Sequence, residues 1–345
     1  MATSTTQTDE HVSLKLVLNE KGNKVLFAEA GKDFVDILCS FLTMPLGTIA
    51  RLVVVEKKSS IGPVTVGCLN SLYQSVADLD ESCFCNDTVK QMLLQPSNPS
   101  EEYCKTLKLN IDDTQPTKYF ACDNNCCSYN DLTTSPYKDK HKCRCGCEFA
   151  SLVFVNHSRQ GFVNGGVTFV ITDDLKVIPN GIDYTSLSML QEQGIKNPSL
   201  LKEVVLNVTK EKVLDLLKHS LLSTSTLTNL FFGKKPSLEN SIVCLPDCES
   251  SSEIGITMKL VIKKSDGKLL YAQVEQDFAD KLLSILTIPL GVVAQIFRGI
   301  CSLGSINRLY KSISDLNKNK YFMSKEAKKI LVDVFYDDDK LIQFF

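Results

Sequence analysis

The sequence predicts an α+β protein built from two related units, and three observations support this fold class. Residues 14–52 and 258–296 resemble each other without a gap, and 17 of the 36 positions from Lys15 to Ala50 are identical in both stretches. Each stretch opens with alternating apolar and polar residues and continues with apolar residues at helical spacing. Seven of the 14 cysteines fall between Cys104 and Cys147. We therefore expect each unit to start with a β-hairpin followed by amphipathic helices, and the first unit to hold a cysteine-rich insertion and a second hairpin.

Length and composition set the outer limits of this fold. A chain of 345 residues is long enough for two domains, and its 43% apolar and 23% charged residues are ordinary globular usage. The formal net charge of -2 gives no general attraction to nucleic acid or to an anionic membrane. No run of 18 apolar residues predicts a membrane span. Residues 1–12 lack the pattern of a secretory signal and are expected to form a disordered tail, so we expect an intracellular protein, cytoplasmic or nuclear.

The first hairpin is predicted from residues 14–28. Leucines alternate with polar residues at the start, residues 19–23 supply turn chemistry around Gly22, and residues 25–28 form the returning strand. In the second copy the turn contains Asp266-Gly267, a strong hairpin dipeptide. The hairpin is thus expected in both units.

A helix is predicted next, with Asp33 as its N-cap and one apolar face. Pro45 and Pro289 end this helix in the two copies, and Gly47 or Gly291 permits the following turn. The shared Leu-Thr-x-Pro-Leu-Gly motif could be a binding loop, but backbone geometry alone explains its Pro and Gly. We interpret the aspartates of the first turns, at 33, 36, 277 and 280, as helix starts rather than acid–base pairs.

Further helices follow in each copy. Apolar residues at helical spacing predict helices over 69–79 and 306–316, and a short helix then begins at Asn86 in one copy and at Ser324 in the other. The second unit, 254–345, therefore repeats residues 13–95 and is expected to lack the remainder of the first unit, 13–235. Residues 236–253 are polar, contain Pro246 and a serine run, and are predicted to be the linker.

The insertion at residues 119–150 carries two cysteine clusters, C-x3-C and C-x-C-G, sixteen residues apart. Paired cysteine clusters resemble a zinc ribbon, in which each cluster supplies two thiolates. The predicted ligands are Cys122, Cys126, Cys143 and Cys145. Cys127, Cys147 and His141 could substitute for one of them. Such a site would hold a loop-rich insertion together and leave no open position for catalysis.

Two other readings of the insertion remain open. The cysteines could stay reduced and without metal, or the basic residues among 138–144 could contact nucleic acid, as in some zinc ribbons. Acidic residues dilute that basic cluster, and no aromatic residues are interleaved with it. Nucleic acid is therefore the less favoured partner. Cys244 and Cys248 lie in the linker without a second pair and are taken as incidental.

The rest of the first unit is predicted to contain a hairpin and three helices. Residues 167–171 are rich in β-branched side chains and are followed by a turn and by residues 176–178. Helices are expected over 182–191, 200–207 and 209–222. The last has Thr209 as its N-cap and His219 near its C-terminus, where the helix dipole favours a positive charge. The glycines from Gly161 to Gly166 precede a strand rather than opening a helix, so they are not a dinucleotide fingerprint.

Several of these stretches together resemble a known family. The run KVLFAEAGKDFVD at 24–36, LTMPLG at 42–47, VTFVITDDL at 167–175 and LLKxSL at 216–221 are similar to the plant-specific family known as domain of unknown function 674. The resemblance covers residues 13–335, and the paired cysteine clusters look like a feature of that family. It implies no activity, cofactor or catalytic residue.

The sequence therefore favours a non-enzymatic structural or interaction module with a zinc-stapled insertion and protein partners. The first alternative is an enzyme or small-molecule binder with a site near the Gly161–Gly166 loop. The second is a zinc-ribbon type of nucleic-acid binder. No catalytic residue or organic cofactor is predicted, and zinc is the one expected metal.

Overall fold

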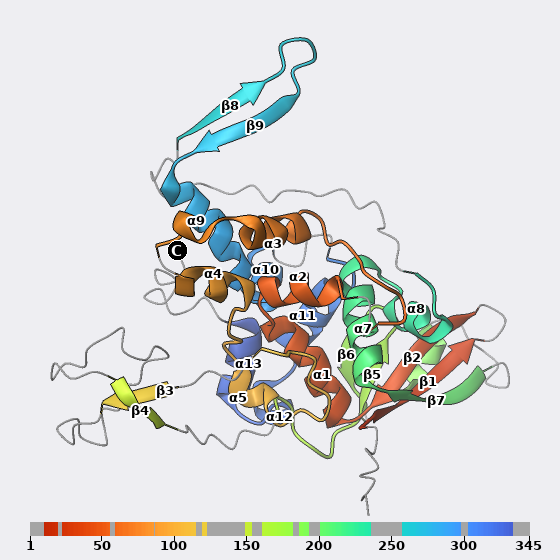
Figure 1. The fold of residues 1–345 in the computed structure, drawn as a ribbon. Helices are drawn as coiled ribbons and strands as arrows, with labels where there is room; N and C mark the ends of the chain where they lie inside the picture. Colours follow the sequence, from red (N-terminus) through yellow and green to blue (C-terminus); the bar gives the residue numbers. More distant parts are fainter. Residues whose placement is uncertain are drawn as a thin grey trace, which may run out of the picture.

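The computed structural model contains one five-stranded sheet, a set of helices packed beside it, and two hairpins set apart from it (Figure 1). It describes residues 10–19, 23–55, 59–85, 87–114, 119–122, 149–153, 161–181, 186–192, 201–235, 257–297 and 303–333. The sheet order is β6-β5-β2-β1-β7, and each neighbouring pair is antiparallel. Its strands are β1 (Val12–Asn19), β2 (Lys24–Ala30), β5 (Phe169–Thr172), β6 (Val177–Pro179) and β7 (Leu201–Val208). Helices combined with antiparallel hairpins agree with the predicted α+β class.

The first hairpin forms as its alternating pattern predicts. Asn23 takes a left-handed conformation with φ 45° in the turn, which asparagine tolerates better than most residues. Leu14 and Leu16 face the main core and are fully buried. Val17 points to the opposite face of the sheet, where a smaller cluster includes Met189 of α6 (Ser186–Glu192). The hairpin is thus covered on both faces.

The predicted helix at 200–207 is wrong, because this segment is the edge strand β7. Apolar residues recur there at helical spacing, which explains the error, but the two adjacent valines also favour a strand. The outer edge of β1 would otherwise present unpaired backbone groups. All eight residues of β7 pair with β1, from Val12 opposite Val208 to Asn19 opposite Leu201. Tertiary pairing therefore decided the local conformation.

Helix α1 (Lys32–Thr43) is the central element of the core. Residues 34–43 are all buried, not only the predicted apolar face. The sheet lies on one side of α1, and helices from the C-terminal part of the chain pack on the other. Its N-cap is Gly31 rather than the predicted Asp33, which lies in the first turn, where a carboxylate favours the helix dipole. The helix ends before Pro45, as predicted.

Short helices continue the first part of the chain beyond α1. They are α2 (Leu46–Val53), α3 (Leu69–Asp78), the 3-10 turn η2 (Glu81–Cys83), α4 (Asp87–Leu94) and α5 (Glu101–Cys104). The Tyr73 hydroxyl of α3 donates to the Leu94 carbonyl at the end of α4 over 3.2 Å. Helix α5 is a single turn that follows Ser100. The Cys104 thiol lies 3.8 Å from the Thr43 hydroxyl.

The middle of the chain supplies the rest of the sheet and its cover. Strands β5 and β6 form the predicted second hairpin, and α6 covers part of the predicted helix 182–191. Helix α7 (Lys210–Leu222) begins as predicted, with the Thr209 hydroxyl accepting from the Lys212 amide. Helix α8 (Thr226–Phe232) ends at Gly233 in the left-handed conformation, with φ 62°. Its Thr228 hydroxyl accepts from the Val25 amide, which ties α8 to β2.

The C-terminal part repeats the order of elements seen at the start of the chain. Its hairpin is β8 (Met258–Ile262) and β9 (Leu269–Val274), followed by α9 (Gln276–Ser284), the 3-10 turn η4 (Ile285–Thr287), α10 (Leu290–Ile296), α11 (Ile306–Asp315), α12 (Lys318–Tyr321) and α13 (Lys325–Val332). The Ser324 hydroxyl caps α13, as predicted. The Tyr310 hydroxyl donates to Val332 over 3.1 Å, as Tyr73 does to Leu94. Residues of α10, α11 and α13 belong to the same hydrophobic core as α1 and β1.

The two similar segments contact each other through their Pro-Leu-Gly turns. Pro45 and Pro289 lie opposite each other in an isolated antiparallel bridge. The Leu46 amide donates to the Ile288 carbonyl over 2.9 Å, and the Leu290 amide donates to Met44 over 3.0 Å. Both bonds join equivalent positions in opposite order, so the contact is reciprocal. The repeated motif therefore functions here as a joint between the two parts of the chain.

Both glycines of these turns are needed for close approach. A Cβ on Gly47 would lie 2.8 Å from the Leu93 carbonyl oxygen and 3.0 Å from that of Leu286. A Cβ on Gly291 would lie 2.9 Å from the Leu42 carbonyl oxygen and 3.1 Å from that of Leu331. Neither glycine has the positive φ of a turn residue, so packing explains them rather than backbone conformation.

Candidate functional site

The loop at Gly161–Gly166, one of the predicted binding regions, is held by the buried carboxylate of Asp36. One Asp36 oxygen accepts from the Phe162 amide at 2.8 Å and from the Val163 amide at 2.9 Å. The other accepts from Lys32 Nζ at 2.7 Å. Gly161 has φ 70°, and a Cβ there would overlap the Asp36 carboxylate. The sequence predicts Asp36 to be part of a helix start, but its main role is to hold this distant loop.

This arrangement leaves the first amides of the loop occupied. Burial raises the pKa of Asp36, while the Lys32 ammonium and the two amides act in the opposite direction. Lys32 also donates to the Val163 carbonyl over 2.6 Å, so its ammonium group binds both the Asp36 carboxylate and the loop backbone. Phe162 is fully buried and stacks on Tyr103, with ring centroids 5.3 Å apart. These groups stabilise the packing of α1 against the loop rather than presenting an open site.

The predicted zinc ligands fall largely outside the described residues. Cys126, Cys143 and Cys145 lie there, together with Cys127, His141 and Cys147, while Cys122 is the last residue of β3 (Tyr119–Cys122). Strand β3 pairs with β4 (Phe149–Val153), and Cys122 stands opposite Phe149. The chain therefore leaves and re-enters this hairpin at the same end. Among the residues that the structure describes, no three His, Cys, Asp or Glu side chains form a group that could hold a metal.

Two described cysteines have the environment of core residues. Cys39 and Cys104 are buried, and burial raises the pKa of Cys39 well above its ordinary value and that of Cys104 to about 12. A thiol with such a pKa stays protonated at neutral pH and is a poor nucleophile. Cys68, Cys83 and Cys85 are exposed and free.

Helix α7 carries four buried polar side chains, which the sequence did not single out as a group: Asp215, Lys218, His219 and Ser220. Asp215 accepts from the Ser60 amide at 3.2 Å, and Lys218 donates to the Val55 carbonyl at 3.3 Å and also to that of Gly62. Burial lowers the pKa of Lys218. Both residues therefore fasten the segment after α2 to α7. The sequence feature that could have indicated this role is an aspartate and a lysine three residues apart within an otherwise apolar helix.

His219 differs from the sequence expectation of a cation near the helix end. Its side chain is fully buried, and neither ring nitrogen has a hydrogen-bond partner among the described residues. Burial lowers its pKa to about 4, against a smaller opposing effect of Asp215. The imidazole is therefore neutral at physiological pH and does not act on the helix dipole as a charge.

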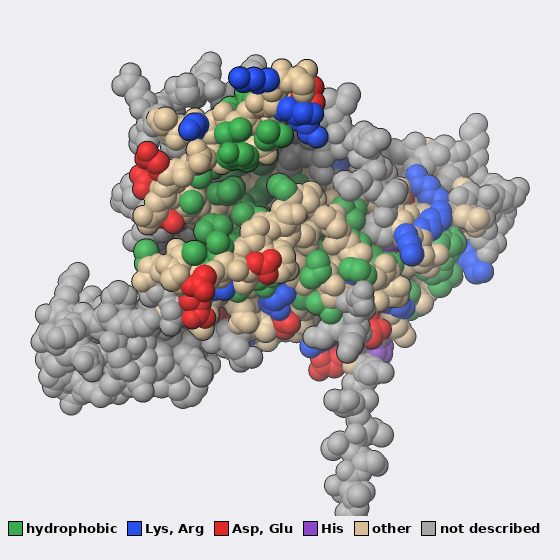
Figure 2. Space-filling view, turned by 45° about the horizontal axis from the view of Figure 1, so that its top comes forward, with side chains coloured by type: hydrophobic (Ala, Val, Ile, Leu, Met, Phe, Trp, Pro, Cys, Tyr) green, Lys and Arg blue, Asp and Glu red, His purple; other side chains and the backbone are tan. Residues whose placement is uncertain are grey.

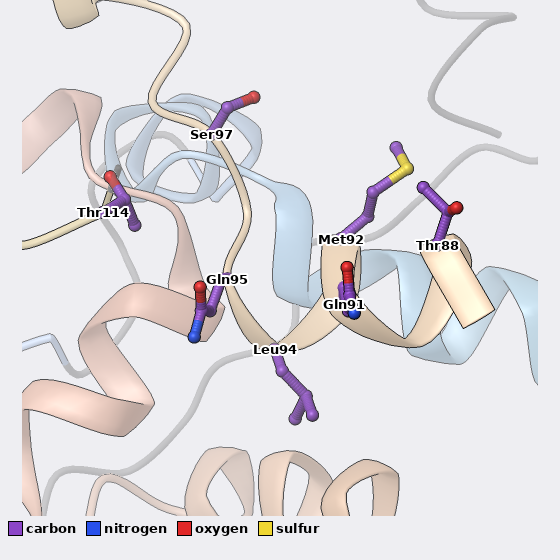
Figure 3. A pocket seen from close by; sticks show the side chains of 7 residues that line it. All are labelled: Thr88, Gln91, Met92, Leu94, Gln95, Ser97 and Thr114. Atoms are coloured by element: carbon purple, nitrogen blue, oxygen red, sulfur yellow. The ribbon is translucent and has the colours of Figure 1, made fainter. Parts of the chain in front are cut away.

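A shallow groove runs along α4 and has a volume of about 470 Å³. It is lined by hydroxyl, amide and apolar side chains from α4 and from the loops beyond it (Figure 3), namely Thr88, Gln91, Met92, Leu94, Gln95, Ser97 and Thr114. No charged residue, histidine or cysteine is among them. The lining residues therefore include no acid or base that could activate the hydroxyl groups of Thr88, Ser97 and Thr114.

The β8–β9 hairpin is the most unusual surface that the structure describes. It projects from the helices (Figure 1), and hydrophobic side chains gather on the projecting face, with lysines around them (Figure 2). Seven apolar residues of the hairpin are 38–56% exposed: Met258, Leu260, Ile262, Leu269, Leu270, Tyr271 and Val274. Monomeric proteins rarely expose so many large apolar side chains close together unless the surface binds something.

The equivalent residues of the first hairpin are 0–6% exposed: Leu14, Leu16, Leu18, Val25, Leu26, Phe27 and Ala30. In that copy, β7 pairs with β1, β5 pairs with β2, and the Gly161 loop donates to Asp36. Asp280 is the counterpart of Asp36, and its side chain accepts at 3.5 Å from Gln276. The second hairpin thus keeps the apolar pattern of a core element, but within the described ranges its two strands pair only with each other.

Comparison with known proteins gives the family of the chain. Neither a curated protein nor a solved structure matches it. Within the described ranges, no helix combines the length and the apolar character needed to cross a bilayer. The family model described as protein of unknown function (DUF674) matches residues 8–344, which is nearly the whole chain. The resemblance of the sequence motifs is therefore confirmed, and the chain belongs to the DUF674 family.

Proposed function

We propose that this chain is a plant intracellular protein that acts as a non-enzymatic interaction module and binds a protein partner through the β8–β9 hairpin. The observation that carries the proposal is the exposure of this hairpin, whose counterpart β1–β2 is buried. Burying apolar surface contributes roughly 25 cal/mol per Å², so covering these seven side chains would favour association. The buried, fully used polar groups around Asp36 and Asp215 support a structural rather than a catalytic use of those residues.

The proposed architecture consists of two related units, 13–235 and 254–345, joined by residues 236–253. The similar order of elements and the reciprocal Pro45–Pro289 contact support a common origin of the units. In this arrangement the first unit completes its own sheet, and the second offers its hairpin to a partner. Strand β1 begins at Val12, one residue before the proposed start of the first unit.

Cross-linking of the full chain in a plant extract tests whether the β8–β9 hairpin binds a partner protein. We expect a partner protein cross-linked to Lys263 or Lys264, and we expect the triple variant L260S, L270S, Y271S to lose it. A matched control is Met92→Ser, because Met92 is an exposed apolar residue of the α4 groove. Equal capture by the triple variant, with unchanged circular dichroism, would overturn the proposal. Loss only with Met92→Ser would place the binding surface in the groove.

We further propose that the insertion at 119–150 is stapled by structural zinc on Cys122, Cys126, Cys143 and Cys145. The return of the chain opposite Cys122 supports this proposal, because it brings the two ends of the insertion together. Four thiolates would close the coordination sphere of zinc, and metal binding would contribute to the folding of the insertion. We expect close to one zinc per chain by elemental analysis, and its loss in a C122S, C143S variant. Fewer than about 0.2 zinc per chain would exclude the site.

A further inference from the structure

The way in which β7 covers the β1–β2 hairpin indicates what kind of strand could cover the equivalent β8–β9 hairpin. Strand β7 pairs with β1 along its whole length, so that Leu206 stands opposite Leu14 and Val204 opposite Leu16. Glu203 stands opposite Val17 and reaches diagonally to Lys15, with 3.0 Å between Nζ and Oε1. The covering strand therefore combines two apolar residues on one face with an acidic residue on the other.

Strand β8 has the same side chains as β1 at three of the positions that β7 contacts. Lys259, Leu260 and Val261 are identical to Lys15, Leu16 and Val17 at the equivalent positions. Among the described residues, β8 pairs only with β9, so the edge that corresponds to the β7 side of β1 is open. An open edge presents backbone donors and acceptors to any extended chain.

The charge of the second hairpin favours an acidic partner over a second copy of the chain. Residues 257–274 contain four lysines, at 259, 263, 264 and 268, against the single acid Asp266. Asp266 pairs with Lys263 over 3.1 Å. Gln273 replaces the acid Glu29 that accompanies Lys15 in the first copy, so Lys259 has lost its acidic neighbour within the hairpin. Two such hairpins placed edge to edge would repel each other.

We propose that a strand from a different polypeptide completes β8, antiparallel to it, with apolar residues opposite Met258 and Leu260 and an acidic residue opposite Val261. This inference rests on the proposed function and specifies the chemistry of the partner. Backbone hydrogen bonds along the open edge provide affinity, and the ion pair with Lys259 sets the register. The strand has the character of β7, whose sequence from Leu201 to Val208 is LKEVVLNV.

The test uses a fluorescent peptide of sequence LKEVVLNV and the full-length chain. We expect saturable binding, measured by anisotropy, and protection of the Met258–Ile262 amides from hydrogen exchange. Exchanging the peptide glutamate for lysine should weaken binding about five- to tenfold, and K259E should have the same effect on the original peptide. The double exchange should restore binding. The matched control is K15E, because Lys15 is the equivalent lysine on a strand that β7 already covers.

Several outcomes would overturn the inference. Binding that responds to K15E but not to K259E would place the peptide at the first sheet. A dimer of the chain in sedimentation velocity that Leu260→Ser abolishes would make a second copy the occupant. Flotation with phosphatidylserine vesicles that displaces the peptide would assign the hairpin to a membrane. If the peptide fails to bind while a cross-linked partner still depends on the hairpin, the inference fails and the proposed function stands. If both experiments fail, neither proposal holds.

Discussion

Pro45 and Pro289 occupy the same position in two similar stretches of sequence and lie opposite each other in an antiparallel bridge. The amide following each proline donates to the carbonyl preceding the other, over 2.9 Å and 3.0 Å. Proline has no amide of its own, so the bridge depends on its neighbours. This contact joins two parts of the chain that are 244 positions apart, and it depends on the glycines two residues further on.

Alanine at Gly47 or at Gly291 should destabilise the protein by about 1–3 kcal/mol each. The added Cβ would lie 2.8 Å from the Leu93 carbonyl oxygen at Gly47 and 2.9 Å from that of Leu42 at Gly291, and backbone cannot move aside as a flexible side chain could. Denaturant unfolding followed by circular dichroism measures the effect. Gly181→Ala is the matched control, because no atom lies within 4 Å of its Cβ position. Equal stabilities of all three variants would contradict the close approach.

Asp36→Ala should cost about 3 kcal/mol of folding stability. The substitution removes the acceptor of two buried amides and one of the acceptors of the Lys32 ammonium. Asp280→Ala removes the equivalent aspartate of the second copy, which is exposed, and should change stability by less than about 0.5 kcal/mol. Thermal unfolding of both variants provides the comparison. Similar losses of stability in the two variants would show that the hydrogen bonds between Asp36 and the Gly161 loop contribute little to folding stability.

His219 should make the protein less stable as the pH falls. Its folded-state pKa is about 4, whereas the unfolded chain has the ordinary value of about 6.5. The unfolded state therefore binds the proton first, and stability on the order of 3 kcal/mol is lost between pH 6.5 and pH 4. His219→Leu should remove this part of the pH dependence in denaturant titrations at several pH values. An unchanged difference between pH 7 and pH 4 would contradict a buried neutral imidazole.

A fragment of residues 1–235 should be markedly less stable than the full chain. It would lack Leu290, Ile306, Leu309 and Ile313, which belong to the core around α1. We expect a broadened or lost thermal transition and binding of a hydrophobic dye. The control is the full chain cut at a protease site placed within 236–253, in which both pieces are still present. A fragment that unfolds as cooperatively as the full chain would mean that the first part completes its own core.

The hairpins and most helices could be predicted because their signals are local. Alternation at Leu14–Leu18, the cap at Thr209 and the stop at Pro45 depend on a few neighbouring residues. Strand β7 could not be predicted from its own sequence, because its apolar residues fit a helix equally well and pairing with β1 decided the outcome. The full burial of α1 was likewise hidden, since the helices that cover its second side come from beyond residue 289.

The exposure of the β8–β9 hairpin could not be predicted from the sequence either. The sequences of β1 and β8 are nearly alike, yet one strand is buried and the other exposed. Nothing within either strand indicates this difference, because it depends on which other segments pair with the strand. Asp36 and Asp280 also look alike in the sequence, and only the structure separates a buried acceptor of backbone amides from an exposed carboxylate. The predicted zinc ligands remain a prediction.

The joint at Pro45 and Pro289 also has a consequence for how the chain reaches its fold. During synthesis, the first hairpin and α1 leave the ribosome more than 200 residues before the segment that completes their core. Contacts of such long sequence separation slow folding, because a large loop must close before they form. Nascent chains with uncovered apolar faces are prone to aggregate and are typical clients of chaperones. We therefore expect this protein to fold late, after translation has passed α11, rather than stepwise from its N-terminus.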